Sequence, residues 1–219
     1  MPRRDRNRYS LKRRAAAHAA ASRVLVLCEG QVTEPSYIRE FKQRERTRLV
    51  EIVVDDRGGV PKTLVERAVE MKKQAEREAR RQRDGFLKYD EVWCVFDVDE
   101  HPNLADARQQ AKANSIKLAL SNPCFELWLL LHFQDQSAHV ERDASKSACR
   151  RHMPDYHKKV PFEVLYPLYE QAVKRAAALE KWQSENDRAG GNPSTKVHHL
   201  TERIRELGRN PVMNSRSGR

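Results

Sequence analysis

Four short apolar runs alternate along this chain with longer segments whose apolar residues recur every three or four positions. Short continuous apolar runs are typical of strands buried on both faces, whereas the three-to-four-residue period is typical of helices with one buried face. The runs predict strands over residues 23–28, 49–54, 91–97 and 116–120.

Three helices are predicted between these strands, over residues 33–48, 61–83 and 102–114. Thr33 suits a helix cap, and Pro35 and Pro61 suit the first turn of a helix. Strands that alternate with helices at this spacing are joined by right-handed crossovers and form a parallel sheet. The pattern therefore predicts an α/β fold with a parallel sheet of about four strands flanked by helices.

The pattern changes at Phe125, after which no further strand is predicted. Residues 125–133 indicate a helix that is apolar on nearly all sides, and further helices are predicted over 144–152, 161–182 and 195–207. We therefore divide the chain into a core over residues 23–133 and a helical C-terminal extension over 134–207. Basic tails over residues 1–22 and 208–219 flank these two parts.

The charge is concentrated near the two ends of the chain. Of the formal net charge of +11, residues 1–14 carry seven basic side chains against Asp5, a net of +6. Residues 203–219 carry five arginines against Glu206, a net of +4, which leaves the segment between them close to neutral. Basic arms of this kind bind the phosphates of DNA or RNA by counterion release, or serve only to keep the protein soluble.

Other classes of protein are not indicated. No apolar run approaches the length of a membrane span, and the N-terminus lacks a secretory signal, so a cytoplasmic protein without membrane contact is expected. The four cysteines have no C-x-x-C spacing and do not indicate a zinc site. His198 and His199 are adjacent at a predicted helix start, and adjacent positions do not share a helix face.

Carboxylates follow two of the predicted strands. Glu29 comes directly after the first strand, and Asp97 and Asp99 close the third. The carboxyl ends of parallel strands meet at one edge of a sheet, where ligands of open α/β sheets bind. Three oxygen donors at such an edge favour Mg²⁺ or Mn²⁺. The alternative is structural, because acidic residues also close strands and occupy the first turn of the next helix.

The carboxylate motifs belong to four longer blocks, which are residues 28–38 (CEGQVTEPSYI), 96–100 (FDVDE), 121–133 (SNPCFELWLLLHF) and 192–197 (NPSTKV). In these blocks the chain resembles the RloB-like family, which is associated with bacterial restriction and abortive-infection loci. A glutamate after the first strand and a D-x-D after the third also resemble the Toprim fold of topoisomerases, primases and OLD-type nucleases. The resemblance implies a Toprim-like metal site and a nuclease that acts in anti-phage defense.

Carried over position by position, the resemblance implies that Asp97 and Asp99 bind Mg²⁺ or Mn²⁺. Glu29 is then a third metal ligand or the general base. Glu126 lies in an apolar stretch, where a lone carboxylate is costly to bury, so it either completes the catalytic site or pairs with an arginine. Glu34 is interpreted as a structural acid in the first turn of its helix.

Three further residues were considered. Arg57, in a glycine-containing loop, and Lys196, near a predicted helix start, are candidate phosphate contacts. His132 ends the apolar helix, where it either satisfies the helix C-terminus or assists proton transfer to a leaving group. We favour the structural role for His132.

The leading hypothesis is a Mg²⁺-dependent nuclease that cleaves phosphodiester bonds of DNA or RNA. The alternative is a non-catalytic subunit that binds nucleic acid or regulates an ATPase encoded nearby. A phosphatase of the haloacid dehalogenase type is ranked last, because its D-x-D follows the first strand rather than the third. A homo-oligomer is compatible with each hypothesis.

Overall fold

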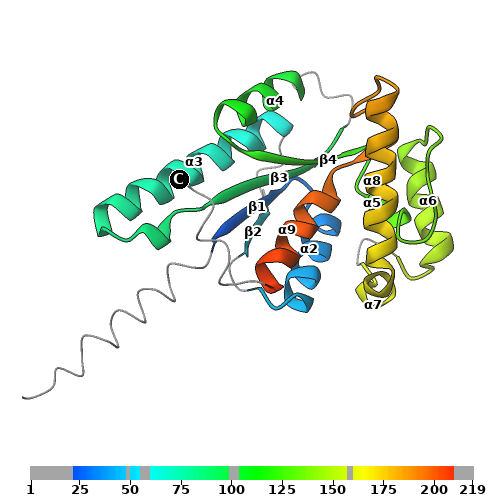
Figure 1. The fold of residues 1–219 in the computed structure, drawn as a ribbon, viewed down its shortest axis with the longest axis horizontal. Helices are drawn as coiled ribbons and strands as arrows, with labels where there is room; N and C mark the ends of the chain where they lie inside the picture. Colours follow the sequence, from blue (N-terminus) through cyan, green and yellow to red (C-terminus); the bar gives the residue numbers. More distant parts are fainter. Residues whose placement is uncertain (1–21, 48–49, 55–59, 99–103, 157–159, 210–219) are drawn as a thin grey trace, which may run out of the picture.

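In the computed structural model, residues 22–47, 50–54, 60–98, 104–156 and 160–209 are described. Their strands form one five-stranded sheet in the order β2-β1-β3-β4-β5 (Figure 1). The strands are β1 (Val24–Cys28), β2 (Val50–Val54), β3 (Glu91–Asp97), β4 (Lys117–Asn122) and β5 (Ser194–Thr195). The first four are parallel, as the sequence pattern predicted. The two-residue β5 was not predicted, and it pairs antiparallel with β4.

The sheet is covered on both faces, which explains why the sequences of its central strands β1 and β3 are nearly continuous apolar runs. Val24, Val26 and Val95 face one hydrophobic core, which they share with α2 (Thr33–Arg44), α5 (Glu126–Leu130), α8 (Tyr169–Glu185) and α9 (Val197–Arg209). Leu25 and Phe96 face a second core, which is closed by α3 (Pro61–Gln82) and α4 (Leu104–Ala113). The structure is therefore an α/β fold with a mostly parallel sheet between helices, consistent with a Toprim-like fold.

The helices of the second half are more broken than the sequence predicted. The apolar segment after residue 125 forms only the short α5, and α6 (Arg142–His152) follows it. The predicted helix over 161–182 is divided into α7 (Phe162–Leu165), the 3-10 helix η2 (Tyr166–Leu168) and α8. Figure 1 shows α5, α6 and α8 at the side of the molecule toward which the strands run.

The last predicted helix begins two residues later than expected, because Ser194 and Thr195 extend the sheet. The Thr195 hydroxyl lies 2.9 Å from the Ser121 hydroxyl on β4, which ties the two strands together. The peptide bonds before Pro123 and Pro193 are both cis, and they stand before α5 and β5.

Part of the C-terminal charge is neutralised inside the fold, which corrects the prediction of a basic arm over residues 203–219. Arg203 lies on α9, and its Nε donates to Glu91 at 2.6 Å. Arg205 is buried, and its Nε donates to Glu45 at 3.0 Å. Both arginines are therefore used to hold α9 in place, and the basic tails proper, residues 1–21 and 210–219, lie outside the described residues.

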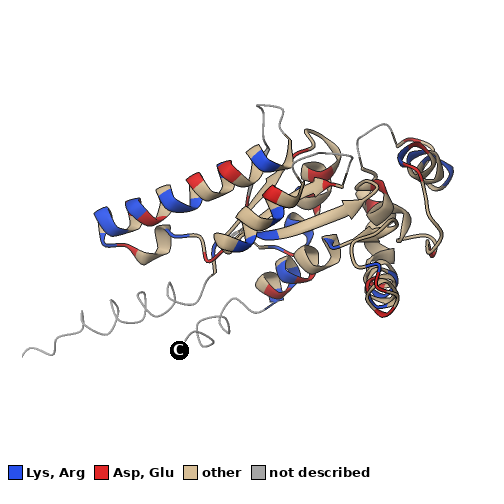
Figure 2. Cartoon of the chain, turned by 90° about the horizontal axis from the view of Figure 1, so that it is seen from above, with Lys and Arg blue, Asp and Glu red and all other residues tan. Residues whose placement is uncertain are grey.

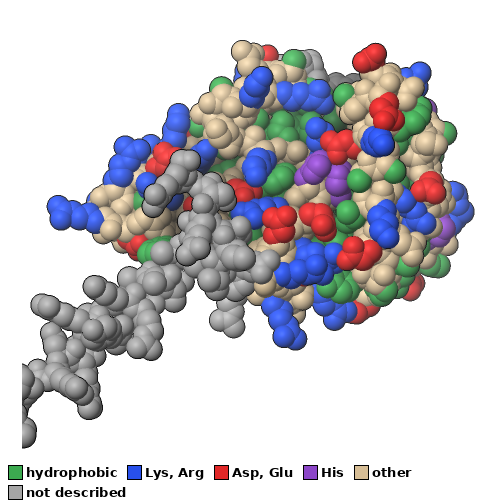
Figure 3. All heavy atoms as spheres, in the orientation of Figure 1, with side chains coloured by type: hydrophobic (Ala, Val, Ile, Leu, Met, Phe, Trp, Pro, Cys, Tyr) green, Lys and Arg blue, Asp and Glu red, His purple; other side chains and the backbone are tan. Residues whose placement is uncertain are grey.

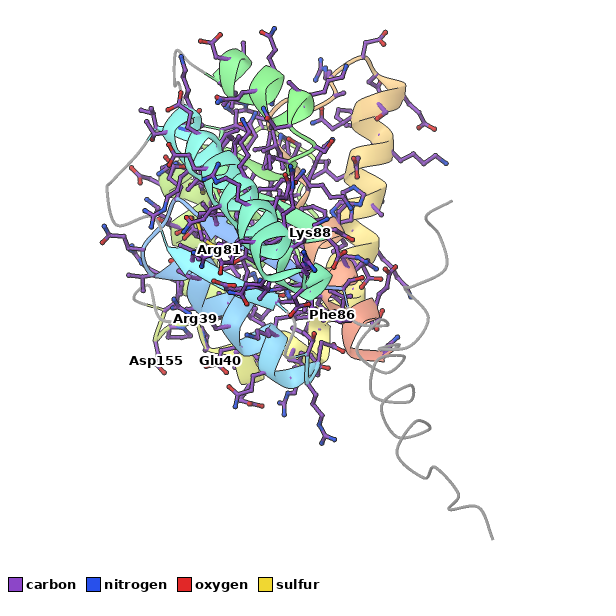
Figure 4. All side chains as sticks on the ribbon, turned by 90° about the vertical axis from the view of Figure 1, so that its left-hand side faces the viewer. Arg39, Glu40, Arg81, Phe86, Lys88 and Asp155 are labelled. Atoms are coloured by element: carbon purple, nitrogen blue, oxygen red, sulfur yellow. The ribbon has the colours of Figure 1, made fainter. Side chains whose placement is uncertain are left out.

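The surface of the described part carries mixed charge. Basic and acidic positions alternate along α3, the longest helix, whereas basic positions predominate on α6 (Figure 2). Figure 4 shows Arg39 and Glu40 on α2, where both side chains are exposed. Among the described residues, no helix is both long and apolar enough to cross a lipid bilayer.

Candidate functional site

Asp97 ends β3 at the carboxyl edge of the sheet, and its side chain is only 15% exposed. The Val98 amide donates to the Ser121 carbonyl at 2.7 Å, so the backbone just beyond Asp97 is fixed to β4. The Arg142 guanidinium, from α6, donates to Asp97 Oδ2 at 2.9 Å. The first aspartate of the D-x-D motif is therefore held in an ion pair at the position where a parallel sheet binds its ligands.

Glu34 lies in the first turn of α2, and its carboxylate folds back over Gly30. A Cβ atom on Gly30 would collide with this carboxylate, so a larger residue at this position would require the Glu34 side chain to move. Burial raises the pKa of Glu34, and the charge of Glu126 raises it further, whereas Arg142 lowers it. Glu34 and Glu126 therefore repel each other electrostatically at the same edge of the sheet.

Glu126 is the first residue of α5 and is buried. Its Oε1 accepts a hydrogen bond from the Tyr156 hydroxyl at 3.0 Å, and that hydroxyl lies 3.4 Å from the hydroxyl of Thr33. The buried thiol of Cys124 has a raised pKa, mainly because of burial and also because of the charges of Glu126 and Asp97. Glu126 and Asp97 are thus both close enough to Cys124 to raise the pKa of its thiol.

These acidic residues line one cavity of about 400 Å³ together with a row of basic residues. The acidic wall consists of Glu34, Asp97 and Glu126, and the basic wall of Arg142, Lys146 and Arg150. The basic residues are spaced by four positions on α6, which places them on one face of that helix. This basic wall was not predicted, although the spacing of its three residues in the sequence is a signal that indicates one helix face.

The other predicted site residues are distributed differently. Glu29 is half-buried, and its amide donates to the Val95 carbonyl at 3.0 Å, but Glu29 is not among the residues that line the cavity. Lys196 lies on a second cavity, which Val98 also lines. Asp99 and Arg57 lie outside the described residues. Glu34, for which the sequence indicates a structural role, lines the same cavity as Asp97.

His132 lies away from this cavity, inside the aromatic core. Its ring is completely buried, with Nδ1 3.0 Å from the Trp128 carbonyl and Nε2 3.2 Å from the Tyr37 hydroxyl. In this arrangement Nδ1–H donates to the carbonyl, and Nε2 accepts from the tyrosine. Burial lowers the pKa of His132 to about 4, so the ring is neutral at physiological pH. These contacts favour the structural role.

The acidic wall has the donor chemistry of a hard divalent cation, because all of its candidate ligands are carboxylate oxygens. The carboxylate oxygens of this wall are farther apart than the ligands of one metal ion. Within the described residues, no three carboxylates bring their oxygens within 4.8 Å of one another. A cation would therefore have to displace Arg142 from Asp97 or recruit Asp99, and metal binding by this wall stays a prediction.

One comparison relates this chain to known proteins. The family model described as RloB-like protein matches residues 24–204, which span the whole sheet and all but the end of α9. The fold makes this chain an α/β protein, and the match shows that it belongs to the RloB-like family. No curated protein and no solved structure matches the chain.

Proposed function

We propose that this protein is a divalent-metal-dependent nuclease of the Toprim type, which hydrolyses phosphodiester bonds of DNA or RNA. The observation that carries the proposal is the cavity in which Glu34, Asp97 and Glu126 face Arg142, Lys146 and Arg150. Carboxylates suit a metal cation, and a row of basic side chains suits the phosphates of a nucleic-acid backbone. Side chains suited to each of these two ligands line the same cavity, which supports the proposal.

Asp97, Asp99 and Glu126 would hold Mg²⁺ or Mn²⁺, with Glu29 as a further ligand or as the general base. When bound, the cation would neutralise charge on the phosphoryl group and make a water molecule more acidic. The chain's own contribution is to position the ligands. Tyr156 orients Glu126 by donating to Oε1, and Gly30 leaves room for Glu34 beside it.

The basic residues have two roles in this proposal. Lys146 and Arg150 bind backbone phosphates as the nucleic acid enters the cavity. Arg142 balances the charge of Asp97, and a cation bound to that carboxylate would allow the Arg142 guanidinium to contact a phosphate instead. The exchange avoids leaving a buried carboxylate without a cationic partner, which would be costly.

Nuclease assays on single- and double-stranded DNA and RNA, with Mg²⁺ or Mn²⁺, test this proposal. We expect cleavage by the wild type that is lost on addition of a chelator, and a fall of at least 100-fold in Asp97→Asn. The matched control is Asp155→Asn, because Asp155 is exposed next to Tyr156 and does not line the cavity (Figure 4). Calorimetry should also detect Mg²⁺ or Mn²⁺ binding that disappears in Asp97→Asn/Asp99→Asn.

A non-catalytic subunit is the second candidate, and the ion pair between Arg142 and Asp97 favours it, because a permanently paired aspartate would not bind metal. That function predicts nucleic-acid binding that is independent of divalent metal and unaffected by Asp97→Asn. Cleavage that continues unchanged in Asp97→Asn would contradict both candidates. The role in anti-phage defense and the partnership with an ATPase encoded nearby rest on the family resemblance and belong to this proposal.

A further inference from the structure

A second cluster of ionisable side chains lies where α8 meets the start of α9. Glu180 comes from the middle of α8, and His198 and His199 occupy the first turn of α9. Glu180 Oε2 lies 3.2 Å from His198 Nε2 and 2.7 Å from His199 Nε2. Figure 3 shows histidine side chains gathered beside acidic ones near the middle of this face of the molecule.

The approach of both imidazoles to one carboxylate oxygen was not expected, because adjacent positions on a helix point in different directions. The structure corrects that expectation. The two rings lie next to each other, with their centroids 4.0 Å apart, and both present Nε2 to the same oxygen of Glu180. His198 is buried, whereas His199 is half-exposed. The turn that precedes them, closed by the His199 amide on the Lys196 carbonyl, sets their position.

The other oxygen of Glu180 has a different neighbour. Lys196 Nζ lies 3.7 Å from Oε1. One carboxylate oxygen therefore faces the lysine, and the other faces the two histidines. This division fixes the carboxylate with one oxygen toward the two imidazoles. An orienting contact to the non-ligating oxygen is what outer-sphere partners provide at metal sites.

We propose that Glu180, His198 and His199 form a binding site for a divalent transition metal ion, with Zn²⁺ as the preferred ion. One ligand atom from each residue lies within 4.8 Å of the others, and this is the only such group among the residues that the structure describes. Two imidazole nitrogens and one carboxylate oxygen suit Zn²⁺ far better than Mg²⁺. Three protein ligands leave a fourth position for water, and Glu180 lines a cavity of about 420 Å³.

This site is separate from the cavity of the proposed nuclease. Glu180 and Lys196 line the second cavity, whereas Asp97 and Glu126 line the first. A metal ion bound here would join α8 to α9 and stabilise the folded chain, because the ligands come together only when both helices are docked. The proposal therefore holds whether or not the protein cleaves nucleic acid.

Zinc titration of the full chain, after treatment with a chelator, tests the proposal. The probe is ZnCl₂ in a buffer with millimolar MgCl₂, so that the carboxylate cavity is offered its hard cation in excess. We expect one Zn²⁺ per chain by calorimetry and a rise in melting temperature on binding. Glu180→Gln and His199→Ala should each weaken binding at least tenfold; both residues are partly exposed, so these variants should fold.

Two controls make the result specific. His139→Ala removes another histidine that contacts a glutamate, at 2.9 Å from Glu141. No third ligand joins that pair within the described part of the chain, so zinc binding should not change. Asp97→Asn/Asp99→Asn should bind zinc as the wild type does, even if it loses Mg²⁺ binding and nuclease activity. The proposal is overturned if wild type binds no zinc, or if Glu180→Gln and His199→Ala bind zinc as tightly as wild type.

Discussion

Glu126 is the residue whose substitution best separates a catalytic from a structural role. Gln at this position keeps an oxygen that can accept from Tyr156, and it removes a charge that raises the pKa of Glu34. We therefore expect Glu126→Gln to change the free energy of unfolding by no more than about 1 kcal/mol while nuclease activity is lost. Melting temperature and cleavage rate, measured on the same preparation, check both parts.

The matched control is Glu40→Gln, which removes an exposed glutamate on α2 (Figure 4) and should leave stability and activity unchanged. If Glu126→Gln instead melts at a clearly lower temperature, Glu126 is mainly half of a buried pair whose partner the substitution leaves uncompensated. A stable and fully active Glu126→Gln protein would rule out both roles.

At the scale of the element, the packing of the segment that follows α5 depends on His132 being neutral, so protonation of His132 should lower the stability of the fold. The His132 pKa of about 4 in the folded chain lies below the ordinary value of 6.5. Between these values the unfolded chain binds a proton that the folded chain does not, so stability falls as the pH is lowered. The contribution is fully present above pH 6.5, and up to about 3 kcal/mol of it is lost by pH 4.

Denaturant unfolding at pH 7, 6 and 5 measures this effect. His132→Asn should be less stable than wild type at pH 7, and the difference should shrink toward pH 5. Burial also lowers the pKa of His198 to about 4, so the comparison with wild type at each pH is what isolates His132. The exposed His139→Ala serves as the control. A difference that is constant across the three pH values would contradict the prediction.

At the scale of the whole molecule, the basic N-terminal tail should control how strongly nucleic-acid binding depends on salt. Deleting residues 1–14 removes a net charge of +6 and the counterion release that goes with it. We expect weaker binding and a shallower plot of log affinity against log salt, with the metal site unaffected. Deleting residues 210–219 removes two arginines and no acid, so its effect should be smaller. If the slope is the same without residues 1–14, the tail only aids solubility.

The sequence by itself determined the four parallel strands and the position of Asp97 at their carboxyl edge. Continuous apolar runs identify the central strands β1 and β3, because a strand buried on both faces leaves no polar position to alternate with. β2 and β4 are apolar enough to be recognised although each contains a charged residue. The parallel order of the four strands follows from the helices between them, and this order places Asp97 at the carboxyl edge. Four sequence blocks between residues 28 and 197 indicate the RloB-like family, which the family model confirms over residues 24–204.

Only the tertiary structure decided which side chains share a site. Glu34 on α2 is about ninety residues away in the sequence from Glu126 on α5, yet both line one cavity with Asp97. The packing of α6 against α5 adds Arg142 to this cavity. The same applies to Glu180 and the His198–His199 pair, which meet because α8 and α9 pack together. Local patterns report which face of an element is buried, whereas the neighbour of a given side chain depends on contacts that no local pattern contains.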